Sequence, residues 1–235
     1  YRLLVKKSIK QGIIKTVDGF LSVKNQSPYI QSLIFWNVYE NPERRAIRKF
    51  MKKDAPIIEL GASLGMVTLT VNKLVNREQK IYSVEANPKL IPNLLETKEL
   101  NKLENLEIVN CALDYSGHST VSFNVDSDNL GSSKYSASEN TQKVSVSTIQ
   151  MHELITRYSI GDYILVSDCE GAEVEILISE NNNEVFKNCK QILIELHQTV
   201  YKNQTYSQQR LAELIIAKFN MHIVYQSGNI WVFEK

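Results

Sequence analysis

Two acidic residues lie on either side of a glycine-containing turn in the first half of the chain. Glu59 precedes Gly61 by two residues, Gly65 follows four residues later, and Glu85 comes 24 residues after Gly61. Glycine lets a chain turn sharply out of a strand and pass close to a ligand. A carboxylate about 20 residues further on binds ribose hydroxyls in dinucleotide sites. The spacing therefore indicates a site for a cofactor that contains adenosine.

The kind of adenosyl cofactor follows from what this turn lacks. The pyrophosphate of NAD is held by backbone amides of a G-x-G-x-x-G turn, whereas this turn reads E-x-G-x-x-x-G, with Ser63 at the middle glycine position. S-adenosylmethionine has no phosphate, and its ammonium and carboxylate suit Glu59 and a helix N-terminus respectively. We expect S-adenosylmethionine and not NAD; a strand-to-helix turn without any ligand is the alternative.

A second group of ionisable residues lies in the last third of the chain. Asp168 ends an apolar run, where a carboxylate is costly unless it serves a ligand, a metal or a hydrogen bond. Glu170 and Glu173 share one face of the helix that follows, although acidic residues also simply stabilise helix N-termini. His197 suits proton transfer at neutral pH, or only a hydrogen bond. We expect Asp168, Glu170 and His197 to be catalytic, with the proton acceptor left open; Mg²⁺ bound by the three carboxylates is a minor alternative.

These groups are expected at the ends of parallel strands. Short apolar runs predict strands, buried on both faces, near 56–61, 80–85, 106–110, 162–168 and 190–197. Helices are predicted near 65–77, 88–101 and 170–180, and another begins with Asn41 as its cap and Pro42 in its first turn. The tail predicts a helix near 206–219 and a hairpin of strands, 221–226 and 230–234, with the last strand antiparallel. The pattern indicates an α/β, doubly wound, Rossmann-like sheet with a reversed last strand, as is typical of methyltransferases.

Composition and charge divide the chain unevenly. The 235 residues, 43% of them hydrophobic, are enough for one sizeable core. Residues 1–53 carry a net charge of +9 and the remainder −8. We expect a basic N-terminal arm, residues 1–37, of unknown role, and one domain over 38–235. The arm could bind an anionic partner, although a solvated helix face is the more common explanation for such charge.

The surroundings of the protein are predicted from three features. No apolar run reaches the ~20 residues that cross a bilayer, and the first residues do not resemble a signal sequence. Cys111, Cys169 and Cys189 are widely spaced in apolar sequence, which favours free thiols in a reducing cytoplasm.

The segment from Asp126 to Thr141 is rich in small polar residues, and is expected to be a lid or acceptor-binding loop, or a tolerated insertion.

Five motifs occur in a fixed order: Glu59-Leu60-Gly61-Ala62-Ser63-Leu64-Gly65, Val84-Glu85-Ala86-Asn87-Pro88, Asn110-Cys111-Ala112-Leu113, Asp168-Cys169-Glu170-Gly171-Ala172-Glu173 and Glu195-Leu196-His197. Together they resemble the FkbM family of S-adenosylmethionine-dependent methyltransferases. The resemblance spans about residues 38 to 235 and includes Tyr39-Glu40, which is similar to a short element before the family's first core helix. It implies a class I methyltransferase fold and methyl transfer to an oxygen, commonly a hydroxyl of a sugar in a glycan or of a secondary metabolite.

The expected roles divide the site into a cofactor part and an acceptor part. Glu59 would bind the methionine ammonium and Glu85 the ribose, and Asp168 would face both the methionine end and the acceptor. The backbone turn comprises Gly61, Ala62, Ser63 and Gly65, while Ala86, Asn110, Cys111 and Ala112 would lie around the nucleoside.

The chain departs from the family pattern at Glu59, where Asp is frequent, at Ser63, where Asn is frequent, and at Val166, where Lys is frequent. Without that lysine, either another basic residue pairs with the acids or their pKa values rise.

Two other classes of function are alternatives to this interpretation. A nucleic-acid N-methyltransferase would carry an N/D-P-P-Y/F turn where this chain has Asp168-Cys169-Glu170-Gly171, and a nonenzymatic cofactor-binding module is compatible with the same fold.

Overall fold

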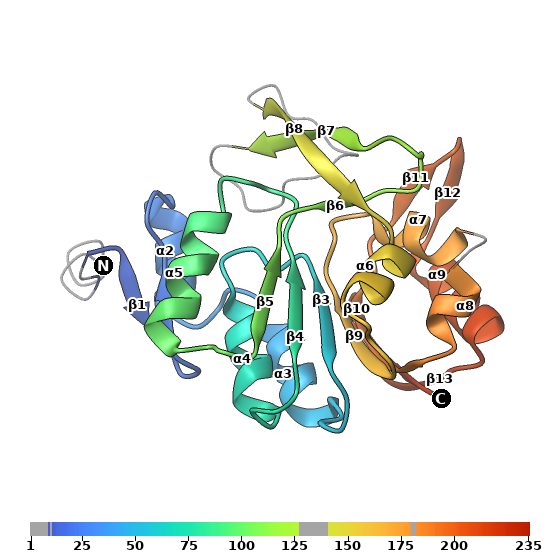
Figure 1. Cartoon of the computed structure of the whole chain (residues 1–235), viewed down its shortest axis with the longest axis horizontal. Helices are drawn as coiled ribbons and strands as arrows, with labels where there is room; N and C mark the ends of the chain where they lie inside the picture. Colours follow the sequence, from blue (N-terminus) through green and yellow to red (C-terminus); the bar gives the residue numbers. More distant parts are fainter. Residues whose placement is uncertain (1–8, 10, 127–140, 180–181) are drawn as a thin grey trace.

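A seven-stranded sheet forms the centre of the molecule (Figure 1). The computed structural model describes residues 9, 11–126, 141–179 and 182–235. In the order β13-β14-β10-β9-β3-β4-β5, the strands are β13 (His222–Ser227), β14 (Ile230–Glu234), β10 (Cys189–Glu195), β9 (Tyr163–Ser167), β3 (Ile57–Leu60), β4 (Ile81–Val84) and β5 (Leu106–Val109). Only β14 runs antiparallel to its neighbours β10 and β13. The predicted parallel strands and the reversed last strand are confirmed, with ends shifted by one or two residues.

The direction of strand addition reverses between β3 and β9. From β3 the chain continues through β4 to β5 at one edge, and it then returns to β9 on the other side of β3. Such a switch point leaves a crevice at the carboxyl ends of the strands, where open α/β sheets bind ligands. The doubly wound α/β prediction is therefore confirmed.

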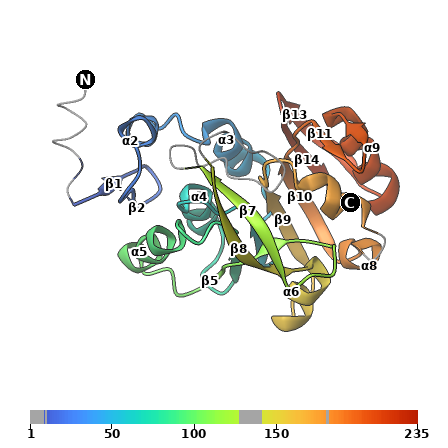
Figure 2. The same cartoon turned by 90° about the horizontal axis from the view of Figure 1, so that it is seen from above.

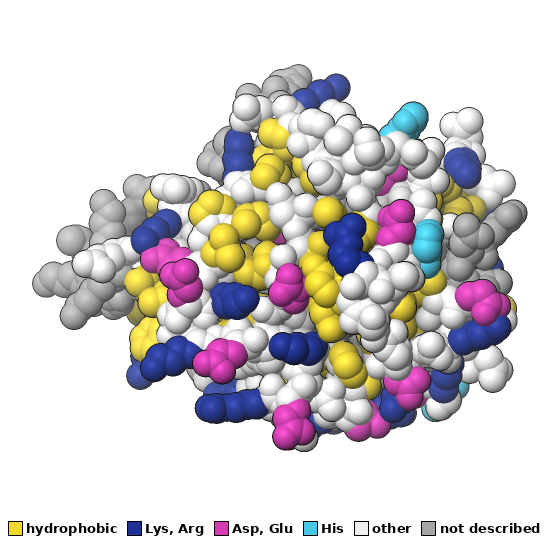
Figure 3. Space-filling view, in the orientation of Figure 1, with side chains coloured by type: hydrophobic (Ala, Val, Ile, Leu, Met, Phe, Trp, Pro, Cys, Tyr) yellow, Lys and Arg dark blue, Asp and Glu magenta, His cyan; other side chains and the backbone are white. Residues whose placement is uncertain are grey.

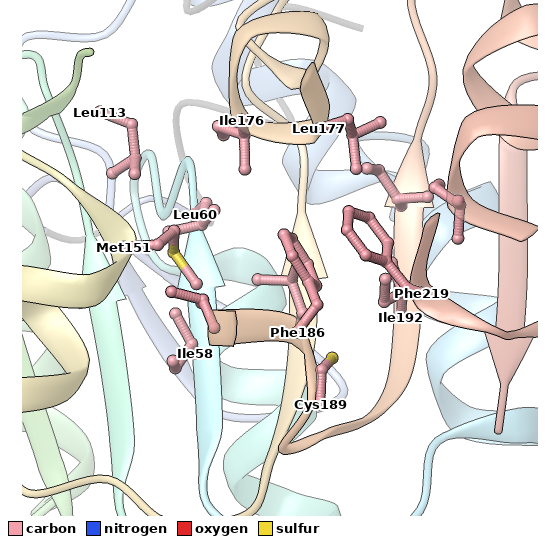
Figure 4. Close-up of a cluster of buried hydrophobic side chains, with 14 of the residues drawn as sticks. Ile58, Leu60, Leu113, Met151, Ile176, Leu177, Phe186, Cys189, Ile192 and Phe219 are labelled. Atoms are coloured by element: carbon pink, nitrogen blue, oxygen red, sulfur yellow. The ribbon is translucent and has the colours of Figure 1, made fainter. Parts of the chain in front are cut away.

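Helices cover both faces of the sheet, because successive strand residues point to opposite sides. One face carries α2 (Pro28–Phe35), α3 (Asn41–Phe50) and α4 (Met66–Leu74), which share a core with Ile57, and α5 (Ile91–Asn101), which packs against β2 and β5. The other carries α6 (Met151–Arg157), α7 (Glu173–Ile178), α8 (Asn182–Phe186) and α9 (Gln208–Phe219), which share a core with Ile58. Figure 4 shows Ile58 and Leu60 beside Met151, and Leu177 above Phe219, in that second core.

The start of α3 differs from the prediction. Asn41 is its first helical residue, and the cap position belongs to Glu40, whose φ is +51° and whose side chain makes no capping hydrogen bond. The predicted helix over 170–180 is also shorter, since α7 ends at Ile178.

A small sheet that the sequence analysis did not predict lies over the carboxyl ends of the central strands (Figures 1 and 2). It consists of β6 (Ala112–Leu113), β8 (Thr141–Ile149) and β7 (Thr120–Asp126), in that order. The polar segment Asp126 to Thr141 would join β7 to β8, but its residues 127–140 lie outside the described part of the chain. A second hairpin, β11 (Thr199–Tyr201) with β12 (Gln204–Tyr206), follows β10.

The described part of the N-terminal segment packs onto the rest of the molecule. A short hairpin, β1 (Ile13–Lys15) and β2 (Phe20–Ser22), shares a core with α3, α4 and β3. The Arg44 guanidinium is fully buried, and it donates to Asp18 Oδ2 at 2.9 Å, Thr70 Oγ1 at 3.0 Å and Asn37 Oδ1 at 2.9 Å. Arg48 pairs with the same Asp18 carboxylate. Two of the basic residues in the first 53 are thus held inside the fold.

The remaining surface charge is mixed on the face shown in Figure 3, where basic and acidic side chains alternate. Within the described residues, none of the helices combines the length and the apolar character that a bilayer span requires.

Replacing Asp18 tests the buried ion pair. Asp18→Ala leaves the Arg44 guanidinium buried without its carboxylate, so the free energy of unfolding should fall by about 3–5 kcal/mol in urea denaturation. Lys187→Ala, which breaks the exposed pair with Glu184 at 2.6 Å, should cost less than about 1 kcal/mol. Equal losses in both variants would contradict a structural role for Asp18.

Candidate active site

A cavity of about 360 Å³ opens at the carboxyl ends of β3, β4, β5, β9 and β10. Small-molecule sites have volumes of about 300–1,000 Å³. Of the residues expected at the site, Gly61, Ser63, Glu85, Ala86, Cys111, Ala112, Asp168 and Glu170 line this cavity. The other expected residues are not among those that line it: Glu59, Ala62, Gly65, Asn110 and His197.

Gly61 brings the turn against the end of the neighbouring strand. Its φ is +86°, and a β-carbon built there would lie 1.8 Å from the Asp168 carbonyl oxygen. The Asp168 amide in turn donates to the Leu60 carbonyl at 3.0 Å. The close approach that glycine permits here is therefore to the backbone of Asp168, and it places this carboxylate beside the turn.

Glu85 is fixed by backbone amides at the end of β4. Its Oε2 accepts from the Ser63 amide at 2.7 Å, and its Oε1 accepts from the Asn87 amide at 2.6 Å. Burial raises the pKa of Glu85, and these amide hydrogen bonds partly offset that rise. Asn110 donates to the Glu85 carbonyl at 2.7 Å, which ties the end of β5 to the end of β4. A carboxylate held in this way is suited to accept hydrogen bonds from the two hydroxyls of a diol.

Glu59 lies beneath the turn and not in the cavity wall. It is 1% exposed and accepts hydrogen bonds from Thr68, at 2.7 Å, and from Ser83. Burial raises its pKa to about 7, although the bonds from Ser83 and Thr68 act in the opposite direction. Its Oε1 accepts no hydrogen bond from the described residues.

Two further residues of the turn position the backbone. The Ala62 amide donates to the Val84 carbonyl at 3.1 Å, and Gly65, with φ +92°, is the N-cap of α4. Both residues shape the turn without facing the cavity.

His197 lies among carboxylates next to the cavity. Its Nδ1 is 3.3 Å from Glu173 Oε1, and its Nε2 is 3.4 Å from Glu195, 3.7 Å from Glu170 and 3.9 Å from Asp168. Burial alone would lower the pKa of His197, but hydrogen bonds to Glu173 and Glu195 and the nearby negative charges raise it to about 11. The ring therefore carries its proton at neutral pH. The expectation that His197 accepts a proton is not supported by these surroundings.

The carboxylates around His197 differ in how they are satisfied. Glu173 accepts from the Cys169 amide at 2.8 Å and from the Gly171 amide at 2.9 Å. Asp168 Oδ1 is buried and accepts no hydrogen bond from the described residues. Burial raises the pKa of Asp168 well above its ordinary value, and the charges of Glu195 and Glu170 raise it further. Both outcomes expected for the missing lysine are thus present: a basic residue, His197, and a raised carboxyl pKa.

Several lining residues were not expected at the site from the sequence, among them Glu43, Leu113, Phe123 and Glu195. Glu43 follows a proline in the first turn of a helix, where acidic residues are common, so its sequence context carries no further signal. Phe123 lies on β7, whose alternation of Val121, Phe123 and Val125 with polar residues predicts a strand. Glu40, part of the Tyr39-Glu40 element, also lines the cavity, and burial raises its pKa to about 8.

Comparison with known proteins gives one family match. Residues 59–223 match the family model of the methyltransferase FkbM domain. No curated protein matches the chain.

Solved structures give weaker likenesses. A precorrin-6y C5,15-methyltransferase from Geobacter metallireducens has 12% identity and a TM-score of 0.45, over 85% of this chain and 88% of that one. Fibrillarin from Aeropyrum pernix with bound S-adenosyl-L-methionine has 11% identity and a TM-score of 0.47, over 78% of this chain and 67% of that one. An rRNA methylase from Streptococcus thermophilus has 10% identity and a TM-score of 0.47, over 83% of this chain and 95% of that one. At such scores these likenesses carry no inference about substrate.

Gly61 provides a test of how the site is assembled. Gly61→Ala adds left-handed strain, about 1–2 kcal/mol, and an overlap with Asp168 that must be relieved at a further cost of about 1–3 kcal/mol. Gly117, with φ +83° and nothing within 4 Å of an added β-carbon, is the matched control for strain alone. Denaturation curves should show a larger loss for Gly61→Ala than for Gly117→Ala; equal losses would mean that the contact with Asp168 is not tight.

Proposed function

Because this chain belongs to the FkbM family of S-adenosylmethionine-dependent methyltransferases, we propose that it transfers a methyl group to a hydroxyl oxygen of a sugar in a glycan or of a secondary metabolite. The chain is an enzyme, and its methyl donor is S-adenosylmethionine. The observation that supports oxygen as the acceptor is the Asp168 carboxylate at the switch point, buried in the cavity wall with a raised pKa.

The described residues fit the cofactor. Glu85 offers a fixed carboxylate to the ribose, and Cys111 and Ala112 form an apolar wall at the end of β5. Asp168 Oδ1 lies in the cavity wall and accepts no hydrogen bond from the described residues, which suits a cationic group of S-adenosylmethionine, whereas Glu59 lies outside the wall. When bound, this cofactor supplies a methyl group on a positively charged sulfur, which is already reactive toward an oxygen.

The task of the protein is then to position the acceptor and to receive one proton. Asp168 accepts the hydroxyl proton on a carboxylate oxygen while the acceptor oxygen gains the methyl group. A raised pKa makes a carboxylate a stronger proton acceptor near neutral pH. The protonated ring of His197, 3.9 Å away, opposes this rise in the pKa of Asp168. We assign Glu170, which also lines the cavity, to the side that binds the acceptor.

Acceptors rich in phosphate fit this site poorly. Six carboxylate residues line the cavity: Glu40, Glu43, Glu85, Asp168, Glu170 and Glu195. Their charge would repel a nucleic-acid backbone, which argues against the nucleic-acid alternative. We retain as proposals a cytoplasmic location, favoured by free Cys111, Cys169 and Cys189, and an anionic partner for the basic residues 1–37. The expected boundary at residue 38 does not separate two bodies, because the described part of residues 1–37 shares a core with the rest of the molecule.

Glu85→Ala tests the cofactor assignment. Loss of charge-assisted hydrogen bonds to the ribose should weaken binding of S-adenosylhomocysteine by about 1–3 kcal/mol in calorimetry. The unaltered protein should not bind NAD. Micromolar affinity for NAD without a response to S-adenosylhomocysteine would refute the site described here.

Asp168→Asn separates chemistry from binding. The amide keeps the shape of the side chain but removes the proton acceptor, so turnover should fall by roughly 10²–10⁴. Release of S-adenosylhomocysteine with a panel of glycosides measures the rate, and thermal unfolding checks the fold. Turnover at the parent rate in this variant would exclude Asp168 as the proton acceptor.

A further inference from the structure

Glu43 is a buried carboxylate that the proposed chemistry does not use. It lies in the first turn of α3, is 4% exposed and lines the cavity. Within the described residues it has neither a hydrogen bond nor an ion pair, and the charges of Asp168, Glu40, Glu195 and Glu59 act on it. Burial and these like charges raise its pKa well above the ordinary value.

Stability does not account for a carboxylate at this position. A helix N-terminus stabilises an acidic residue by about 0.3–1 kcal/mol, whereas burial of an uncompensated charge costs several kcal/mol. Glutamine would fill the same volume without that charge. Of the described residues that line the cavity, none is Lys, Arg or His, so a cationic group on a ligand would be the positive partner that stabilises the charged form of Glu43.

The cofactor is a poor source of that charge. Its expected contacts, Gly61, Glu85 and Cys111, follow β3, β4 and β5, whereas Glu43 belongs to α3, which packs against α4, β10 and β14. S-adenosylmethionine also carries a carboxylate at its methionine end, which Glu43 and Glu40 would repel. We therefore assign Glu43 to the acceptor and not to the cofactor.

The distances between Glu43 and the other ionisable side chains favour an organic cation over a metal ion as the partner of Glu43. Asp168, Glu195 and His197 offer ligand atoms within 4.8 Å of one another, but Glu43 joins no such group among the described residues. A metal ion needs its ligands at about 2.0–2.6 Å, hence close together. An ammonium group donates over about 2.7–2.9 Å and can reach carboxylates that stand further apart.

We propose that the methyl acceptor carries a positively charged amino group near the hydroxyl that is methylated, as in an amino sugar, and that Glu43 binds this amino group. This inference rests on the proposed methyl transfer to a hydroxyl and narrows the class of acceptor.

Binding of matched sugars tests the proposal. Glucosamine, galactosamine and mannosamine are titrated by calorimetry into the protein saturated with S-adenosylhomocysteine, each beside its N-acetyl derivative, which lacks the charge. At least one amine should bind 10-fold or more tightly than its N-acetyl partner, and in Glu43→Gln this ratio should fall to near one. If no amine binds better than its partner, the proposal is overturned.

The affinity for S-adenosylhomocysteine separates this proposal from the proposed function. Glu43→Gln should bind it within about twofold of the parent, because Glu43 is placed outside the cofactor contacts. A loss of 10-fold or more would overturn the proposal by assigning Glu43 to the cofactor. If the parent itself fails to bind S-adenosylhomocysteine, the proposed function fails first.

Thermal unfolding gives a readout that needs no sugar. Glu43→Gln removes repulsion among carboxylates, so the midpoint should rise by a few °C without ligand. Glu173→Gln is the matched control, because Glu173 is equally buried but accepts two backbone hydrogen bonds, and it should lower the midpoint. A lower midpoint for Glu43→Gln would show that Glu43 is structural and would overturn the proposal.

Discussion

The contact between Gly61 and the backbone of Asp168 is the constraint on which the site depends. These residues follow β3 and β9, two parallel strands paired from Ile57 with Ile164 to Leu60 with Ser167. Since strand addition reverses at this pair of strands, the connections that leave β3 and β9 run to opposite sides and leave the crevice open. The absent β-carbon lets the turn and the carboxylate emerge side by side, so the cofactor turn and the proposed proton acceptor cannot move independently.

Hydrogen bonds divide the carboxylates of this crevice into two kinds. Glu85 and Glu173 each accept from two backbone amides, which fix their position and compensate their charge. Asp168 Oδ1 accepts no hydrogen bond from the described residues, and the charges that act on Glu43 are those of other carboxylates. Buried polar groups without partners are costly in a fold. Groups of the first kind position the site, while those of the second kind face whatever binds there.

The parts of the fold that the sequence predicted are those with local signals. Continuous apolar runs indicate strands buried on both faces, and the turn around Gly61 is recognisable from its glycines. The hairpin of β7 and β8 was overlooked although Phe123 and Val125 alternate with polar residues, because the polar segment beside it favoured a loop. The pairing of Arg44 with Asp18, 26 residues apart, has no local signal. The charge state of His197 depends on Glu173 and Glu195, which only the folded chain brings around its ring.

The position of β14 has a consequence for how the protein comes to be made. It follows every other described strand along the chain, yet it lies inside the sheet, between β10 and β13. Residues 229 and 230, at the start of this strand, also form part of the cavity wall. Because a ribosome delivers the chain from its N-terminus at about 5–20 residues per second, the nascent enzyme exposes an incomplete sheet edge until this strand emerges. Its binding cavity is therefore completed only after every other described strand has been synthesised.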